Sequence, residues 1–271
     1  MKALMFAVLL VGCLGTVPPT APIVSAAATD LAPAPTATLI VSGANPRYRT
    51  DGCPDGMVRV SGEFCPHPKE VCAEWLDKPG GIIRRCKRYE QTHTCLSATM
   101  RKDFCIERTE HLEPNGSRLP IVSVDAYQAE AICKKEGSRL CYESEHLAAC
   151  QGTEWRPYPE GWERDCSAST GGIGCNCDTY TNLGSVEHRV DHRKTPEETA
   201  QCVSEFGAIN LVGNVDEFYR KDLSPSKYEH ILASGHWMPI RAMCQRATTA
   251  HSSLYSANSA GFRCCADPKE Q

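Results

Sequence analysis

Seventeen cysteines in a chain of 271 residues are the feature that most constrains how this protein folds. They recur along the whole sequence and do not gather into one cluster of C-x-x-C pairs, so a single zinc site does not account for them. Cysteine usage at this level is typical of proteins that fold in an oxidising compartment, where the thiols pair as disulfides. The sequence therefore predicts an exported, disulfide-rich protein in which most cysteines are structural.

The amino terminus agrees with export. Residues 1–12 join a basic start to an apolar run that is too short to span a bilayer, which predicts a cleaved signal peptide. The run ends in LVGC, which resembles the bacterial lipobox and predicts a lipid on Cys13. The alternative is ordinary cleavage near Ser25, Ala26 and Ala27, with Cys13 removed. Sixteen of the seventeen cysteines remain in either case, an even number that can pair completely.

Three segments are expected after the signal peptide. Residues 13–50 are rich in Pro, Ala and Thr and predict a flexible tether. Residues 51–268 are expected to form one domain, with a cysteine-rich insertion pinned by disulfides at about 66–103. The net charge of −4, without a block of like charge, indicates no nucleic-acid partner. The lipid on Cys13 predicts membrane contact in the periplasm or at the outer membrane of a Gram-negative-type bacterium.

Hydrophobic periodicity predicts a few regular elements inside this domain. The stretch 56–64, GMVRVSGEF, alternates apolar and polar residues as an edge strand does, and 103–111, DFCIERTEH, predicts a short strand. The stretch 123–137, SVDAYQAEAICKKEG, predicts a helix that Ser123 caps. A second helix is expected at 142–150, YESEHLAAC.

Two motifs have both a chemical and a structural interpretation. His188 and His192 have the four-residue spacing of a zinc pair on a helix, but no third ligand is near, so surface histidines are favoured. Cys264 and Cys265 are adjacent, and neighbours on a strand point to opposite faces. Two different disulfide partners are therefore favoured over a redox switch or a thiolate copper site.

Several motifs in order resemble the formylglycine-generating enzyme family, the sulfatase-modifying factors. The stretch 209–219, INLVGNVDEFY, resembles the family signature N-[ILM]-x-G-N-[VA]-W-E-W. Other segments of the family are matched by GMVRVSGEF, FCIERTE, PIVSVDAYQAEAIC, SRLCYESEHLAACQG and SAGFRCCAD. The resemblance implies the family's fold, a compact irregular α+β domain of C-type-lectin-like character.

The resemblance also implies two disulfides, Cys133 with Cys264 and Cys150 with Cys244. Each closes a loop of about a hundred residues or more and is worth on the order of 4 to 5 kcal/mol in the chain-entropy model. The pairing of the other twelve cysteines beyond Cys13 stays open.

Enzymes of the family bind Cu(I) through two further cysteines, in a C-x-x-x-x-C-x-x-x-x-C run whose last member is the structural one. Counting back from Cys244, these two positions hold Pro239 and Ser234. Proline has no ligand atom, and a hydroxyl is a hard donor that does not hold Cu(I). The chain is therefore expected to lack catalytic residues and to act as a binding or structural module. The alternative is an active oxidase with copper on relocated ligands.

The resemblance further implies a Ca²⁺ site in the signature segment. Asn210 and Glu217 would give side-chain oxygens, and Gly213 and Val215 would give backbone carbonyls, which are donors that suit a hard cation. The alternative is that the segment keeps only its turn, with Gly213 and Asn214 at unusual φ.

Two further expectations follow from the family's layout. His236, Trp237 and His251 are expected at a groove that binds a peptide or glycan ligand. A second Ca²⁺ site is expected at Asn176 and the carbonyl of Cys177.

Overall fold

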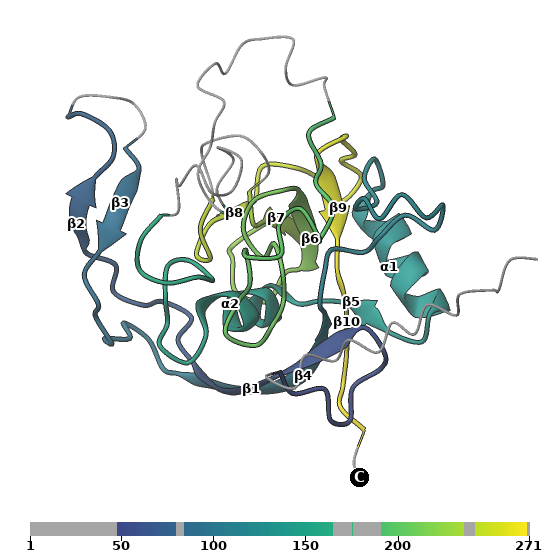
Figure 1. The fold of residues 1–271 in the computed structure, drawn as a ribbon, viewed down its shortest axis with the longest axis horizontal. Coiled ribbons are helices and arrows are strands. Elements are labelled where there is room, and N and C mark those ends of the chain that lie inside the picture. Colours follow the sequence, from purple (N-terminus) through teal and green to yellow (C-terminus); the bar gives the residue numbers. More distant parts are fainter. Residues whose placement is uncertain (1–47, 80–83, 165–174, 176–190, 236–241, 270–271) are drawn as a thin grey trace, which may run out of the picture. The chain divides into compact units, whose positions relative to one another are not determined.

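The computed structural model describes residues 48–79, 84–164, 175, 191–235 and 242–269 (Figure 1). In chain order, the described elements are β1 (Met57–Phe64), β2 (Cys72–Trp75), β3 (Cys86–Tyr89), β4 (Met100–Glu107), α1 (Ala126–Lys135), β5 (Arg139–Leu140), α2 (Glu143–Gln151), β6 (Asp216–Arg220), β7 (His230–Ala233), β8 (Ala247–Thr248), β9 (Ala260–Phe262) and β10 (Cys264–Ala266). Neither of these helices has the length and hydropathy that a membrane span requires.

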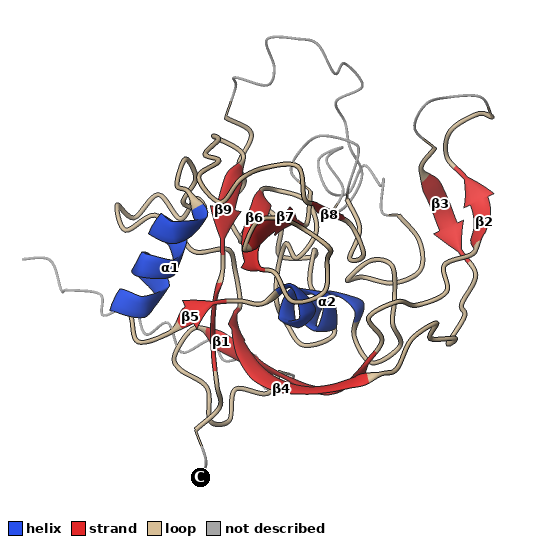
Figure 2. Ribbon diagram, turned by 180° about the vertical axis from the view of Figure 1, so that it is seen from behind, coloured by secondary structure: helices blue, strands red, loops and turns tan. Residues whose placement is uncertain are grey.

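The described strands form two four-stranded sheets and one hairpin (Figure 2). The first sheet has the order β1-β4-β10-β5 and the second has the order β8-β7-β6-β9, in which β6 and β9 run parallel. Strand β1 lies at a sheet edge and pairs with β4 along its whole length, as its alternating sequence predicts. The α+β, disulfide-rich fold class predicted from the sequence is confirmed.

Helix α1 begins two residues later than its sequence suggested, and the prediction that Ser123 caps it is wrong. Asp125 is the cap: its Oδ1 accepts from the backbone N–H of Gln128 at 2.9 Å, and Gln128 Oε1 accepts from the Asp125 N–H at 2.9 Å. This reciprocal capping box satisfies two backbone donors that Ser123 alone would leave open. Gly137, with φ of +75°, follows the end of the helix.

Both helices pack against β6. Helix α2 is buried along its whole length and also contacts β1 and β4, so Leu147 and Ala148 lie in the larger hydrophobic core. Helix α1 also contacts β5 and β9 and buries Ala126 and Ala129 in a second core. Because both cores meet at β6, the signature segment that leads into this strand is held at the centre of the fold.

Seven disulfides join the fourteen cysteines that the structure describes. Two are the pairs that the resemblance implies, Cys133–Cys264 and Cys150–Cys244. The others are Cys53–Cys105, Cys65–Cys95, Cys72–Cys86, Cys141–Cys265 and Cys175–Cys202. Adjacent Cys264 and Cys265 therefore have different partners, which is the structural interpretation that their sequence favoured.

The expected cysteine-rich insertion contains the hairpin of β2 and β3. The Cys72–Cys86 bridge joins its two strands, and Cys65–Cys95 closes the segment that carries it. Its expected end at about residue 103 falls inside β4, which begins at Met100 and pairs there with Phe64. The first half of β4 has an exposed face with charged side chains, so its sequence gives little hydrophobic signal.

Candidate functional site

Cys244 and its disulfide form one wall of the candidate site. Cys244 is bonded to Cys150 near the end of α2, and both side chains are almost fully buried. The backbone N–H of Cys244 donates to the carbonyl of Pro157 at 2.9 Å, which fixes the chain on the far side of the bridge. The thiolate is the form of cysteine that binds metals, so a bridged sulfur is a poor ligand for Cu(I). Cys244 is therefore a structural residue.

Ser234, which the resemblance places at a copper-ligand position of the family, follows the end of β7. It is fully buried and has φ of +80°, a backbone conformation that residues with side chains rarely adopt. Its carbonyl accepts from the N–H of Gly213 at 3.1 Å, so it is tied to the signature segment. The position keeps a defined structural role but offers a hydroxyl where the chemistry needs a soft thiolate. Pro239, His236 and Trp237 lie outside the described residues.

A fully buried ionic cluster of Arg263, Glu217 and Glu110 lies beside the signature segment. Arg263 Nε donates to Glu217 Oε1 at 3.0 Å and to Oε2 at 2.9 Å, and Arg263 Nη2 lies 3.8 Å from Glu110 Oε2. Burial raises the pKa of both carboxyl groups, although the guanidinium opposes the shift. Because the Arg263 cluster holds two carboxyl groups and only one cation, protonation of one of the carboxyl groups is favoured.

Two asparagines of the signature segment hold Glu110 in this cluster. Asn214 Nδ2 donates to Glu110 Oε1 at 2.7 Å, and Asn210 Nδ2 lies 3.3 Å from Oε2. Both have positive φ, of +58° at Asn210 and +55° at Asn214, which asparagine tolerates better than most residues. A Cβ atom on Gly213 would lie 2.6 Å from the carbonyl oxygen of Cys175, so this turn requires glycine. The turn with unusual φ, left open by the sequence, is therefore present.

The expected Ca²⁺ ligand set does not fit these contacts. Both carboxylate oxygens of Glu217 accept from Arg263, and the hydroxyl of Tyr219 donates to the same carboxylate. A Ca²⁺ ion at this carboxylate would face the guanidinium cation directly, and the repulsion would be strong in buried surroundings. The other expected ligands, Asn210, Gly213 and Val215, then lack their carboxylate partner. We derive no function from calcium here, and the second expected site, at Asn176 and Cys177, lies outside the described residues.

Chelation tests this conclusion. We expect excess EDTA to leave the melting temperature of the purified protein unchanged, because Arg263 already neutralises Glu217. A ligand that binds only the folded state raises stability by mass action, so a bound ion would be revealed when it is removed. A melting temperature that falls in EDTA and recovers with added Ca²⁺ would show instead that calcium displaces Arg263 from Glu217.

The remaining expected site residues are only partly described. Of the residues expected at the groove, His251 is the one that the structure describes. It follows β8 and stacks on Tyr255 with ring centroids 3.9 Å apart. Of the two histidines with zinc-like spacing, His192 is described and His188 is not. Ser234 is therefore hydrogen-bonded to the signature segment, and Leu211 and Val212 of that segment share the larger hydrophobic core with the Cys150–Cys244 bridge. The groove stays a prediction.

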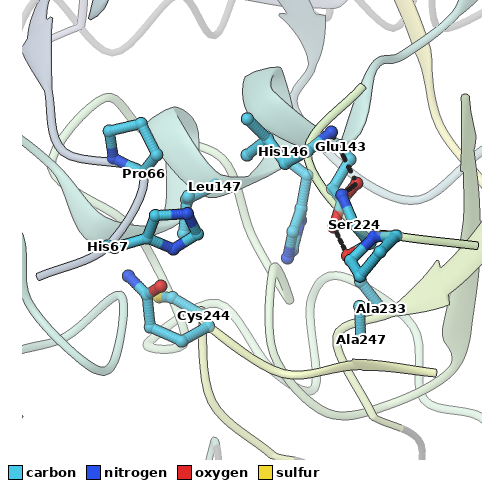
Figure 3. A pocket seen from close by; sticks show the side chains of 12 residues that line it. Pro66, His67, Glu143, His146, Leu147, Ser224, Ala233, Cys244 and Ala247 are labelled. Atoms are coloured by element: carbon cyan, nitrogen blue, oxygen red, sulfur yellow. Dashed lines mark hydrogen bonds between the residues drawn. The ribbon is translucent and has the colours of Figure 1, made fainter. Parts of the chain in front are cut away.

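A cavity that sequence reasoning missed lies beside this bridge (Figure 3). Its volume is about 130 Å³, and its walls include Cys244, Leu147, Leu223 and Ala247. His146 of α2 projects into it (Figure 3). The available signal was a histidine, His146, in the middle of the second expected helix. Sequence reasoning did not single it out.

Comparisons with known proteins give a family and a set of distant structures. The sequence model of the sulfatase-modifying factor enzyme 1-like domain matches residues 72–268. The solved structure of CarF is 13% identical to this chain, with a TM-score of 0.47; the match covers 76% of this chain and 100% of CarF. Variable protein 1 of Treponema denticola is 16% identical with a TM-score of 0.42, covering 82% of this chain and 98% of its own. PvdO from Pseudomonas aeruginosa is 16% identical with a TM-score of 0.41, covering 80% of this chain and 95% of its own. No curated protein shows significant sequence similarity to the chain.

Proposed function

This chain belongs to the family of sulfatase-modifying factor enzyme 1-like domains, and we propose that it is a member without oxidase activity that acts as an exported binding or structural module. The family fold is retained, with its two helices, its two sheets and the turn of its signature segment. The residues that would hold copper in the active relatives are replaced. The protein thus keeps a stable scaffold and loses the metal chemistry.

The state of the cysteines carries this proposal. A Cu(I) site of the family type needs two thiolates, and the fourteen described cysteines are all in disulfides. Cys13, Cys166 and Cys177 are the cysteines outside the described residues. A copper site relocated to the adjacent pair would also lack thiolates, because Cys264 is bonded to Cys133 and Cys265 to Cys141.

A turnover assay tests the proposed loss of activity. Purified protein is incubated with Cu(I), oxygen, a reductant and a cysteine peptide of the sulfatase type, beside an active member of the family. We expect the active member to convert the peptide thiol to an aldehyde and this protein to leave the peptide mass unchanged. Copper-dependent conversion that disappears in a Cys265→Ser variant would show that the adjacent pair supplies the ligands, and would contradict the proposal.

Placement in the cell envelope is proposed from the amino terminus. The LVGC sequence supports acylation of Cys13, and the Pro-rich segment behind it supports a tether. We expect a Cys13→Ser variant to move from the membrane fraction to the soluble fraction, since the lipid would be its attachment. The matched control Ala27→Leu alters the alternative cleavage site and should stay in the membrane fraction. A soluble wild-type protein whose mature chain starts near Ala28 would rule out the lipid anchor.

A further inference from the structure

The hairpin of β2 and β3 belongs to neither of the two four-stranded sheets. Its strands pair with each other and with no other described strand, and it lies at the margin of the domain in both views (Figures 1 and 2). Backbone hydrogen bonds anchor its base: the N–H of Tyr89 donates to the carbonyl of Trp162 at 2.9 Å, and the N–H of Arg164 donates to the carbonyl of Lys87 at 2.8 Å. The other end of the hairpin is therefore the part that is available to a partner.

Five exposed side chains gather at this other end, which we call the hairpin end: Trp75, Leu76, Lys78, Pro79 and Arg84. Trp75 is 45% exposed and Leu76 is 38% exposed, so two large apolar side chains that are adjacent in the chain meet solvent. Residues 80–83 lie outside the described residues and are not part of this surface. The hairpin end thus presents apolar and cationic groups together.

The charge of the hairpin is opposite in sign to that of the chain. The described stretches 72–79 and 84–89 hold five cationic and two acidic side chains, whereas the whole chain has a net charge of −4. The acidic neighbours are at the base, because Glu90 follows β3 and the backbone of Glu163 pairs with Arg88. The positive charge is therefore concentrated toward the hairpin end.

Ion pairs inside the hairpin neutralise both of its carboxylates. Arg85 Nη2 lies 2.7 Å from Asp77 Oδ1, and Lys87 Nζ lies 2.8 Å from Glu74 Oε1. Within the part of the chain that the structure describes, neither Lys78 nor Arg84 has an ion-pair partner. These two exposed cations are left to attract an anionic partner.

The cation of Arg84 and the ring of Trp75 lie on the same face. The Arg84 guanidinium is 4.0 Å from the centroid of the Trp75 ring, and Trp75 is in register with Cys86, to which the Cys72–Cys86 bridge ties the opposite strand. A partner that covers this face must therefore accept a cation and an apolar ring at once. The boundary between phosphate headgroups and acyl chains does so, and tryptophan beside basic residues is typical of protein segments at that boundary.

We propose that the hairpin end docks on an anionic phospholipid bilayer, with Trp75 and Leu76 at the boundary of headgroups and acyl chains and Lys78 and Arg84 against the lipid phosphates. Attraction to the anionic surface and burial of apolar area add together in such a contact. The contact goes beyond the proposed module without oxidase activity and does not require a lipid on Cys13.

Vesicle binding of the purified Cys13→Ser protein tests the proposal, because this variant cannot carry the lipid. We expect it to sediment with phosphatidylglycerol vesicles and to bind phosphatidylcholine vesicles at least tenfold more weakly, with the difference shrinking at high salt. Tryptophan emission should shift to shorter wavelength in the anionic vesicles, because Trp75 leaves water. Failure of this protein to bind phosphatidylglycerol vesicles, or equal binding to both kinds of vesicle, would overturn the proposal, whether or not Cys13 is acylated in the cell.

Two pairs of charge variants in the same background test the cations. Lys78→Gln with Arg84→Gln should weaken binding to the anionic vesicles by about fivefold for each cation removed. The matched control, Lys134→Gln with Lys135→Gln in the last turn of α1, changes the net charge equally and should bind as the parent does. An equal loss in both pairs would show that only net charge matters, and the hairpin end would no longer be the docking surface.

A serine substitution tests the apolar part of the contact. Trp75→Ser should weaken binding about tenfold and abolish the shift in tryptophan emission, because the buried ring is lost. Leu254→Ser is the control, since Leu254 is 69% exposed after β8 and should not contribute. Binding of soluble heparin as tight as that of anionic vesicles, without a shift in emission, would overturn the proposal and identify an acidic polysaccharide as the partner.

Discussion

Replacing Cys150 and Cys244 together by alanine is expected to lower the free energy of unfolding by about 4 kcal/mol or more. The bridge joins residues 94 positions apart, so its loss restores a large conformational entropy to the unfolded chain. Both sulfurs are buried in the larger hydrophobic core, and their removal also leaves a small void there. Urea denaturation of the double variant, with the other disulfides intact, measures the loss.

The Cys72–Cys86 bridge is the matched control for this change. It closes a loop with a separation of only 14 residues in the β2–β3 hairpin, away from the larger core. Its replacement by two alanines is expected to cost about 3 kcal/mol at most, because the entropy depends on loop length. An equal or smaller loss for the Cys150 and Cys244 pair would contradict the structural role assigned to Cys244.

Arg263→Met is expected to destabilise the protein by about 3 to 5 kcal/mol at pH 7. The change leaves Glu217 and Glu110 buried without their cation, which is far more costly than losing an exposed ion pair. Urea denaturation at neutral pH measures this loss. Arg59→Met is the control: Arg59 pairs with Asp103 at 2.7 Å at the surface, and its replacement should lower the free energy of unfolding far less than Arg263→Met does.

The pH dependence of the Arg263→Met variant follows from the raised pKa of its two carboxyl groups. In the wild type, burial raises both pKa values in the folded state while Arg263 opposes the rise. Without Arg263 the folded pKa values rise further, so the folded variant binds protons at a pH where the unfolded chain has released them. Its stability should therefore increase relative to the wild type as the pH falls from 7 toward 5. A loss of the same size at both pH values would show that the Arg263 cluster is not what the substitution disrupts.

Local patterns predicted several elements of this fold because the information was local. A few adjacent residues specify both the alternation in β1 and the polar cap before α1, although the cap is Asp125 and not Ser123. The parallel pairing of β6 with β9 joins Asp216 to Ala260, and no local signal specifies such a contact. Most disulfide pairs could not be assigned from the sequence for the same reason: cysteine spacing does not determine connectivity.

The candidate site was predictable only where the family resemblance covered it. The resemblance implied the Cys150–Cys244 bridge, which the structure confirms, and a substituted ligand position at Ser234, which stays a prediction. It did not reveal that Arg263 would bind Glu217, because the GFRC stretch gives no sign that its arginine is buried. The burial of His146 was hidden too, since α2 has no apolar stripe and the hydrogen-bond donors to its Glu143 lie in the distant 223–224 turn.

Disulfide mapping of the purified protein tests most directly the claim that this family member has no thiolate pair for copper. The protein is denatured without a reductant, alkylated, digested and analysed by mass spectrometry. We predict a cross-linked peptide that joins Cys150 to Cys244, and no alkylation at any of the fourteen cysteines in the described disulfides. Alkylation of Cys244, or of two described cysteines that could act together as ligands, would contradict the account.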